Sequence, residues 1–111
     1  MAGNMNTLMA IEMLVDDAAT FAYTVTRGFE VVDMICNTNF AVASTVTPQR
    51  TGVALGAAMT TSAINDIVYA TTLVDAQATF VAGDILQFVG DAATMDVEVY
   101  ALVIPTTWIA G

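Results

Sequence analysis

The sequence lacks histidine and lysine altogether, and these two absences exclude much of the chemistry that enzymes use. Without histidine there is no imidazole to act as a general base, to complete a Ser-His-Asp triad or to bind a metal. Without lysine there is no Schiff base and no P-loop. The seven glycines are scattered and form no phosphate-binding motif. We therefore expect that the protein is not an enzyme and binds no cofactor.

Positive charge is almost absent, because Arg27 and Arg50 are the only cations beside 11 carboxylates, and the net charge is −9. Binding to nucleic acid needs a basic patch that neutralises phosphates, and binding to an anionic membrane has the same need. No apolar run reaches the ~18 residues that a membrane-spanning helix requires. The sequence therefore predicts no nucleic-acid partner and no membrane partner.

Metal-binding and thiol chemistry have few candidates. Asp16 and Asp17 are adjacent, and Asp96 and Glu98 share one face of an expected strand. Neither pair has the dense Asp/Asn/Gly spacing of a calcium loop, so we interpret both as turn or surface charges and predict no metal site. The single Cys36 lies in an apolar run without a basic neighbour that would lower its pKa, which favours a buried, inert thiol.

Charged residues are scarce, at 12% of the 111-residue chain beside 57% apolar residues, whereas about 25% charged is typical. We therefore expect the excess apolar surface to be buried in an oligomer or a larger assembly. The length corresponds to one domain, which we assign to residues 8–105, with a flexible N-terminal arm over 1–7 and a C-terminal tail over 106–111. Residues 8–15 lack the basic start and the cleavage site of a signal peptide, so we expect no secretion.

The clearest structural pattern is a pair of strand-like runs over 84–89 and 96–105, which are separated by turn residues and are rich in β-branched and aromatic residues. In the second run, alternate residues from Val97 to Val103 are small and apolar, which indicates a face turned to a core. The opposite face is polar at first and then apolar. We interpret the two runs as an antiparallel hairpin inside a sandwich, with Phe88 and Val99 in the core.

The rest of the chain also reads as short strands with frequent turns. Period-two alternation over 8–15 favours a strand over a helix there. Pro48 is expected to end a strand because it cannot donate to the ladder. Residues 75–78 predict one helical turn with Asp75 as its N-cap, and 81–84 predict a turn. Further strands are expected over 20–26, 29–36, 40–47 and 67–73, with an irregular segment of short strands over 52–64. These patterns predict an all-β fold, an antiparallel, jelly-roll-like β-sandwich of about seven or eight strands.

The aromatic residues are candidates for a sugar-stacking platform, but most lie inside apolar runs, which favours core packing. These residues are Phe21, Tyr23, Phe29, Phe40, Tyr69, Phe80, Phe88 and Tyr100. Trp108 lies past the last strand and either anchors on a neighbouring subunit or packs onto its own domain. The terminal segments have few polar residues. The candidates for inter-subunit contacts are therefore Met9, Ile11, Met13, Trp108 and Ile109.

About two thirds of the chain, from Phe29 to Pro105, resembles the β-sandwich decoration or cement proteins of tailed-bacteriophage capsids. The most specific part is Asp-Ala-x-x-Thr-Phe-x-x-Gly-Asp-x-Leu, which runs from Asp75 to Leu86. The other parts are Phe29-Glu30-Val31-Val32-Asp33, the Thr45–Thr47 strand, Ala63-Ile64-Asn65-Asp66-Ile67, Ala70-Thr71-Thr72-Leu73 and the last strand.

The resemblance implies a non-enzymatic homotrimer, made in the host cytoplasm, that lies on the outer surface of the virion and clamps neighbouring major capsid protein subunits. Another reading is a head-fibre or tail-tip module that recognises a host-surface glycan. A cluster of exposed aromatic side chains on loops would favour that glycan-binding module. A broad, flat apolar surface would favour the decoration protein.

Overall fold

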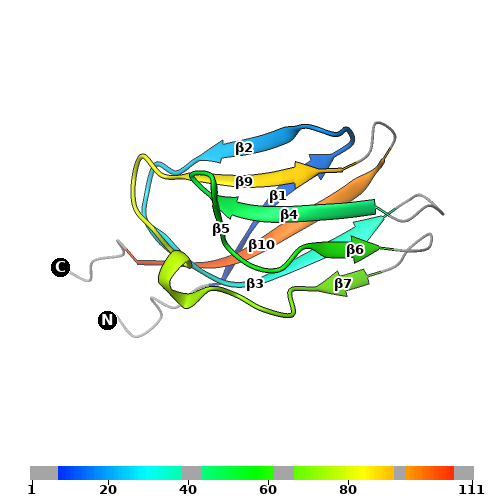
Figure 1. Ribbon diagram of the computed structural model, residues 1–111. Coiled ribbons are helices and arrows are strands. Elements are labelled where there is room, and N and C mark those ends of the chain that lie inside the picture. The colour runs from blue at the N-terminus through cyan, green and yellow to red at the C-terminus, as the bar shows by residue number, and fades with distance from the viewer. Residues whose placement is uncertain (1–7, 39–43, 62–66, 92–94, 107–111) are drawn as a thin grey trace.

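The computed structural model describes residues 8–38, 44–61, 67–91 and 95–106, and these residues form two antiparallel sheets packed face to face (Figure 1). The elements within these ranges are ten strands and one turn of 3₁₀ helix, η2 (Asp75–Gln77), with no α-helix. The predicted all-β antiparallel sandwich is confirmed. The strand count exceeds the predicted seven or eight because the irregular segment after Gly52 holds two short strands and because the two-residue strand Thr79–Phe80 is too short to give a sequence pattern.

Sheet A has the strand order β1-β10-β3-β7, and β8 also pairs with β3. Sheet B has the order β2-β9-β4-β5, and β6 also pairs with β4. The strands of sheet A are β1 (Met9–Val15), β3 (Phe29–Thr38), β7 (Ile67–Tyr69), β8 (Thr79–Phe80) and β10 (Val97–Pro105). Those of sheet B are β2 (Thr20–Thr24), β4 (Ser44–Arg50), β5 (Val53–Ala54), β6 (Met59–Thr61) and β9 (Ile85–Gly90).

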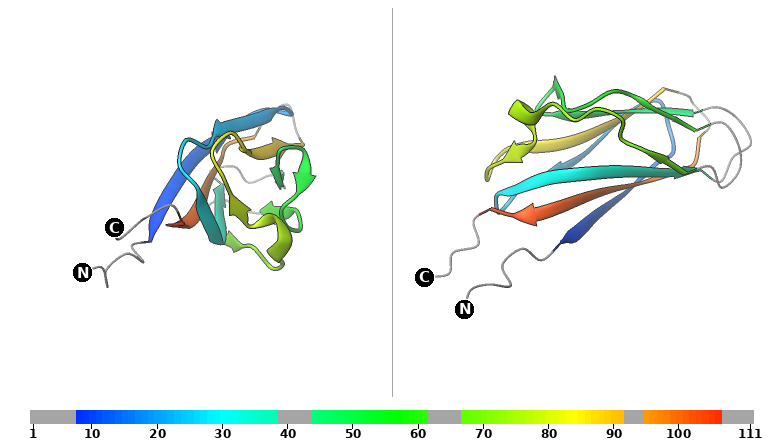
Figure 2. Two further views of the ribbon diagram at one scale, coloured as in Figure 1. Left: turned by 90° about the vertical axis from the view of Figure 1, so that its left-hand side faces the viewer. Right: turned by 90° about the horizontal axis from the view of Figure 1, so that it is seen from below.

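The hairpin predicted for 84–89 and 96–105 is wrong, although both strands exist. β9 pairs with β2 and β4 in sheet B, whereas β10 pairs with β1 and β3 in sheet A. Each strand buries alternate residues, and the two inward faces meet across the core (Figure 2). An apolar alternation shows which face is buried but not which strand lies alongside, so the local pattern could not separate a hairpin from an arch between sheets.

A close backbone approach occurs where this arch begins. Gly90 ends β9 beside the connection that carries the chain from β1 to β2, and its N–H donates to the carbonyl of Ala19 at 3.0 Å. A Cβ atom on Gly90 would overlap the carbonyl oxygen of Asp17 and lie 2.8 Å from the sulfur of Met95. Only glycine lets the two connections approach this closely.

A β-bulge in β3 keeps apolar side chains in the core along the whole strand. Val103 is opposite Val31, but Leu102 is opposite Asp33, so Val32 is the extra residue. The inward positions therefore shift from Val31 to Met34, and Val32 is exposed. The strand expected over 29–36 is therefore buried on one face, and its alternation changes phase at the bulge.

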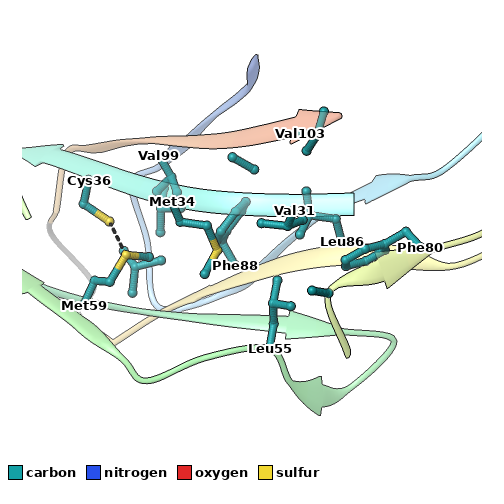
Figure 3. Packing of buried hydrophobic residues seen from close by; sticks show 14 of the residues in the cluster. Val31, Met34, Cys36, Leu55, Met59, Phe80, Leu86, Phe88, Val99 and Val103 are labelled. Atoms are coloured by element: carbon teal, nitrogen blue, oxygen red, sulfur yellow. Dashed lines mark hydrogen bonds between the residues drawn. The ribbon is translucent and has the colours of Figure 1, made fainter. Parts of the chain in front are cut away.

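The core lies between the sheets, and both residues predicted for it, Phe88 and Val99, are fully buried (Figure 3). Cys36 is also fully buried, and its thiol lies 3.7 Å from the sulfur of Met59 on the facing sheet. Burial raises the pKa of the Cys36 thiol to about 12. The predicted buried thiol is therefore confirmed, and its thiolate form is strongly disfavoured.

Two local predictions need correction. β4 continues through Pro48 to Arg50, because the Pro48 carbonyl accepts from the Leu55 N–H, away from β9. In an antiparallel strand the N–H and C=O of one residue point to the same side, so the missing N–H does not interrupt the ladder to β9. Asp75 is not an N-cap. It is the first residue of η2, and Val74 occupies the cap position without a side-chain hydrogen bond.

The remaining short segments follow the predictions where they are described. Asp84 donates its N–H to the Val81 carbonyl, and Gly83 has a φ of 97°, the geometry of a type II turn. The segment after Gly52 is irregular, with the short strands β5 and β6. The strand expected over 67–73 is shorter and ends at Tyr69. The expected arm over 1–7, residues 40–43 and 62–64, and residues 107–111 of the tail lie outside the described residues.

Candidate interaction surface

The described residues contain no group of three or more His, Cys, Asp or Glu side chains that could hold a metal ion. Within the same ranges, no helix has the length and apolar character needed to cross a bilayer. Asp16 and Asp17 are exposed in the β1–β2 connection, and Asp96 and Glu98 lie at the start of β10. The remaining candidates for a functional site are the two outer faces of the sandwich.

The outer face of sheet A combines apolar side chains with carboxylates. The strand register places its side chains in cross-strand rows, one with Leu14, Glu98, Asn37 and Ile67, and the next with Glu12, Tyr100, Ile35 and Tyr69. A third row holds Ala10, Leu102 and Asp33. We call these eleven residues the sheet A face.

Large apolar side chains on the sheet A face are exposed at both of its edges. Leu14 on β1 is 51% exposed, and Ile67 and Tyr69 on β7 are each 56% exposed. Exposed apolar side chains are ordinary when they are single. Here the register places them on the same outer side of one sheet, which is the arrangement expected of a protein-binding surface.

The charge on the sheet A face has one sign. Glu12, Asp33 and Glu98 lie on its strands, and none of the strands of sheet A contains an arginine. Tyr100 lies between Glu12 and Glu98. Its pKa is raised, first by desolvation, then by the charges of Glu98 and Glu12, and further because its single O–H can donate to either carboxylate. The phenol thus remains a neutral donor between two carboxylates, in the middle of an anionic face.

The outer face of sheet B has a different character. Its strands present uncharged side chains, mostly threonine and glutamine, outward. Several bond within the sheet itself: the Thr45 and Thr60 hydroxyls are 2.9 Å apart, and the Gln87 amide oxygen accepts from the Gly52 N–H at 2.6 Å. Such a face is readily hydrated and several of its polar groups are already partnered, so the sheet A face is the better candidate for contact with another protein.

The most specific part of the resemblance, Asp75 to Leu86, makes polar and aromatic contacts with the end of β4. Arg50 at the end of β4 forms an ion pair with Asp84, with Nη2 3.0 Å from Oδ2, and donates from Nη1 to Gln77 at 3.2 Å. Its guanidinium lies 5.6 Å from the centre of the Phe80 ring, which stacks on Phe29. One of the two cations of the chain therefore has a structural role here.

Asp84 also fastens the turn that leads into β9. Its carboxylate accepts from the Val81 N–H at 2.9 Å and from Arg50. The pKa of Asp84 is lowered, chiefly by the hydrogen bond from the Val81 N–H; desolvation opposes this, and the hydrogen bond and charge of Arg50 lower the pKa further. The Gly83-Asp84 pair of the resemblance is thus explained locally, by a turn that needs a positive φ and an acceptor for its N–H groups.

The predicted interface residues on β1 differ in how far their side chains are exposed. Met9 is 48% exposed, whereas Ile11 and Met13 face inward and are half-buried against the core. Their role in inter-subunit contacts stays a prediction. Trp108 and Ile109 lie outside the described residues.

Sequence reasoning missed Leu14, Ile67 and Tyr69. Core packing was predicted for most aromatic residues, and Phe29, Phe80 and Phe88 are buried. For Tyr69 and Tyr23 the prediction is wrong, because both lie on edge strands and are exposed. Comparisons with protein-family models, curated proteins and solved structures found no match to this chain.

Proposed function

We propose that the protein is a structural component of a phage head, which decorates the outer surface of the capsid and stabilises it by bridging major capsid subunits. The observation that carries the proposal is the sheet A face, which has exposed Leu14, Ile67 and Tyr69 and carboxylates as its only charges. It matches a partner surface that offers apolar contacts surrounded by basic groups, since complementary charge sets the register of docking and speeds encounter.

The resemblance over Phe29 to Pro105 supports the same function. Each copy contributes a modest contact, and many copies act together on a shell through multivalency. We also propose that three copies form a closed ring through heterologous contacts, which would cover apolar surface that a single copy leaves in water. The particle location would be the outer surface of the virion.

The glycan-binding alternative receives less support. It would be favoured by exposed aromatic side chains gathered on loops. Among the described residues, the exposed aromatic side chains are Tyr23 and Tyr69, and these lie on strands of different sheets. They offer no common platform on which a sugar ring could stack.

Thermal release of the genome tests the proposal. Particles that lack the protein should release their DNA at a lower temperature than complete particles, and adding the purified protein should restore the difference. Equal release temperatures with and without bound protein would contradict the stabilising role.

A pair of variants tests which face docks. Tyr69→Lys on the sheet A face should weaken binding to stripped particles, because it places a cation where a basic partner is expected. Thr47→Lys makes the same charge change on the outer face of sheet B and should bind like the parent protein. If Thr47→Lys is the weaker binder, the docking face is the wrong one.

A further inference from the structure

β1 is an edge strand without the usual protection. It pairs with β10 along all seven of its residues, and within the described ranges no strand pairs with its other side (Figure 2). An edge of this kind presents a row of unpaired N–H and C=O groups. Proteins normally block such edges with charged side chains, above all lysine, or with proline, a bulge or a very short strand. β1 has no lysine and no proline, the bulge of sheet A lies in β3, and Glu12 is the one charge on its seven residues.

The side chains of β1 are also apolar on both faces of the sheet. Met9, Ile11 and Met13 point to the inner side, whereas Leu14 points to the outer side. Leu8, just before the strand, and Met9 are about half exposed, at 52% and 48%. The strand therefore has both open backbone groups and uncovered apolar side chains along the same edge.

We propose that β1 pairs antiparallel with β1 of a second copy, around a two-fold axis at Ile11, so that the two A sheets join into one. In this register Ile11 faces Ile11 of the other copy and Met9 faces Met13, all on the inner side. On the outer side Leu8 faces Leu14. These cross-strand pairs are apolar, and in the remaining pair the single carboxylate, Glu12, faces the small side chain of Ala10.

The sequence of β1 selects this register over its neighbours. A two-fold axis at Glu12 would place two carboxylates directly opposite each other, which is destabilising. An axis at Met13 would place Leu14 against Glu12 and shorten the paired region. If the register shifted by one residue, the inner-side residues of one copy would lie opposite the outer-side residues of the other. The occupant of the edge is therefore a second copy, because the strand complements itself about Ile11.

This pairing goes beyond the proposed function and does not depend on it. It requires an even number of copies, whereas a three-membered ring requires a multiple of three. The mass of the purified protein separates the two: a dimer supports the pairing and contradicts the ring, a trimer does the reverse, and a hexamer supports both. A stable monomer at micromolar concentration contradicts both.

A matched pair of variants tests the edge by sedimentation equilibrium. Leu14 and Ile67 lie at opposite ends of the same cross-strand row and are similarly exposed, at 51% and 56%. Leu14→Lys should halve the mass of the assembly, and Ile67→Lys should leave it unchanged. The proposal is overturned if Leu14→Lys has no effect or if Ile67→Lys has the same effect.

A rescue variant tests the register and guards against misfolding. Adding Leu8→Glu to Leu14→Lys places opposite charges across the axis at both ends, and the original mass should return. In the register centred on Met13, Leu14→Lys alone would face Glu12 and strengthen association, an outcome that overturns the axis at Ile11. Circular dichroism of each variant should keep its β signal, so that a change in mass reports on pairing.

Cross-linking gives a direct measure of the axis. Directly opposed residues of an antiparallel pair have Cα atoms about 4.5–5.5 Å apart, within the range for a disulfide. Ile11→Cys should therefore form a covalent dimer on mild oxidation. Met13→Cys should not, because Met13 faces Met9 of the other copy. The native Cys36 is buried and does not interfere. Equal cross-linking of both variants would contradict the register.

Discussion

Replacing Phe88 by alanine should remove a large part of the stability of the domain. Phe88 lies on β9, a strand with a neighbour on each side, and its ring is fully buried between the sheets. Burying such a ring contributes about 1.5–3 kcal/mol by transfer alone. The cavity left by the truncation raises the cost to about 3–5 kcal/mol, beside a total stability of about 5–15 kcal/mol for typical domains.

Phe21 provides the control, because it undergoes the same chemical change in the same row. It is directly opposite Phe88 on β2, at the edge of sheet B, and is only half-buried. Less apolar surface leaves water there, and the edge can relax around the loss. Phe21→Ala should therefore cost about half as much as Phe88→Ala.

Denaturant unfolding followed by circular dichroism measures both losses. All variants need the same protein concentration, because self-association adds to apparent stability. The reasoning is refuted if Phe88→Ala costs less than about 1 kcal/mol, or if Phe21→Ala costs as much. Either result would mean that the inward face of β9 has been assigned incorrectly.

Three further measurements test other parts of the fold. Gly90→Ala should cost about 1–3 kcal/mol in denaturant unfolding, because the new methyl group overlaps the Asp17 carbonyl. Since burial raises the pKa of Cys36 from 9.0 to about 12, the unfolded chain loses this proton first. Stability should therefore fall between pH 9 and pH 12 by up to about 1.4 kcal/mol per pH unit, a component that Cys36→Ala removes. The lowered pKa of Asp84 has the opposite sign. Its contribution is present above pH 3.8 and is lost as pH falls further, so Asp84→Asn should flatten the acid limb of a stability-against-pH profile.

The sequence predicted burial best where a single strand buries one face along its whole length. In β10, burial of one face imposes a period of two, and the alternate residues Val97, Val99, Ala101 and Val103 are all buried as the pattern predicted. The burial of Cys36 and Phe88 follows from the same cause. The turn at 81–84 was also predictable, because Gly83 and Asp84 supply what that backbone needs within a few residues.

The candidate surface was less predictable. Leu14, Ile67 and Tyr69 are apolar like many core residues, and only strand register brings them to one side of one sheet. Nothing within the short β7 segment indicates which side faces water. The predicted Met9, Ile11 and Met13 share β1 with Leu14 but point to the inner side of the sheet, and their role in inter-subunit contacts stays a prediction.

The sequence by itself determined that the chain forms a β-sandwich with an anionic surface, because alternation, turn residues and charge are properties of short segments and of composition. Only the tertiary structure decided which strands are neighbours. β9 and β10 are adjacent in the chain and lie in different sheets, whereas β1 and β10 come from opposite ends and pair along seven residues. Strand pairing depends on how the apolar faces of all the strands are buried together. Because that depends on segments far apart in the chain, the sequence of one strand does not show which strand lies beside it.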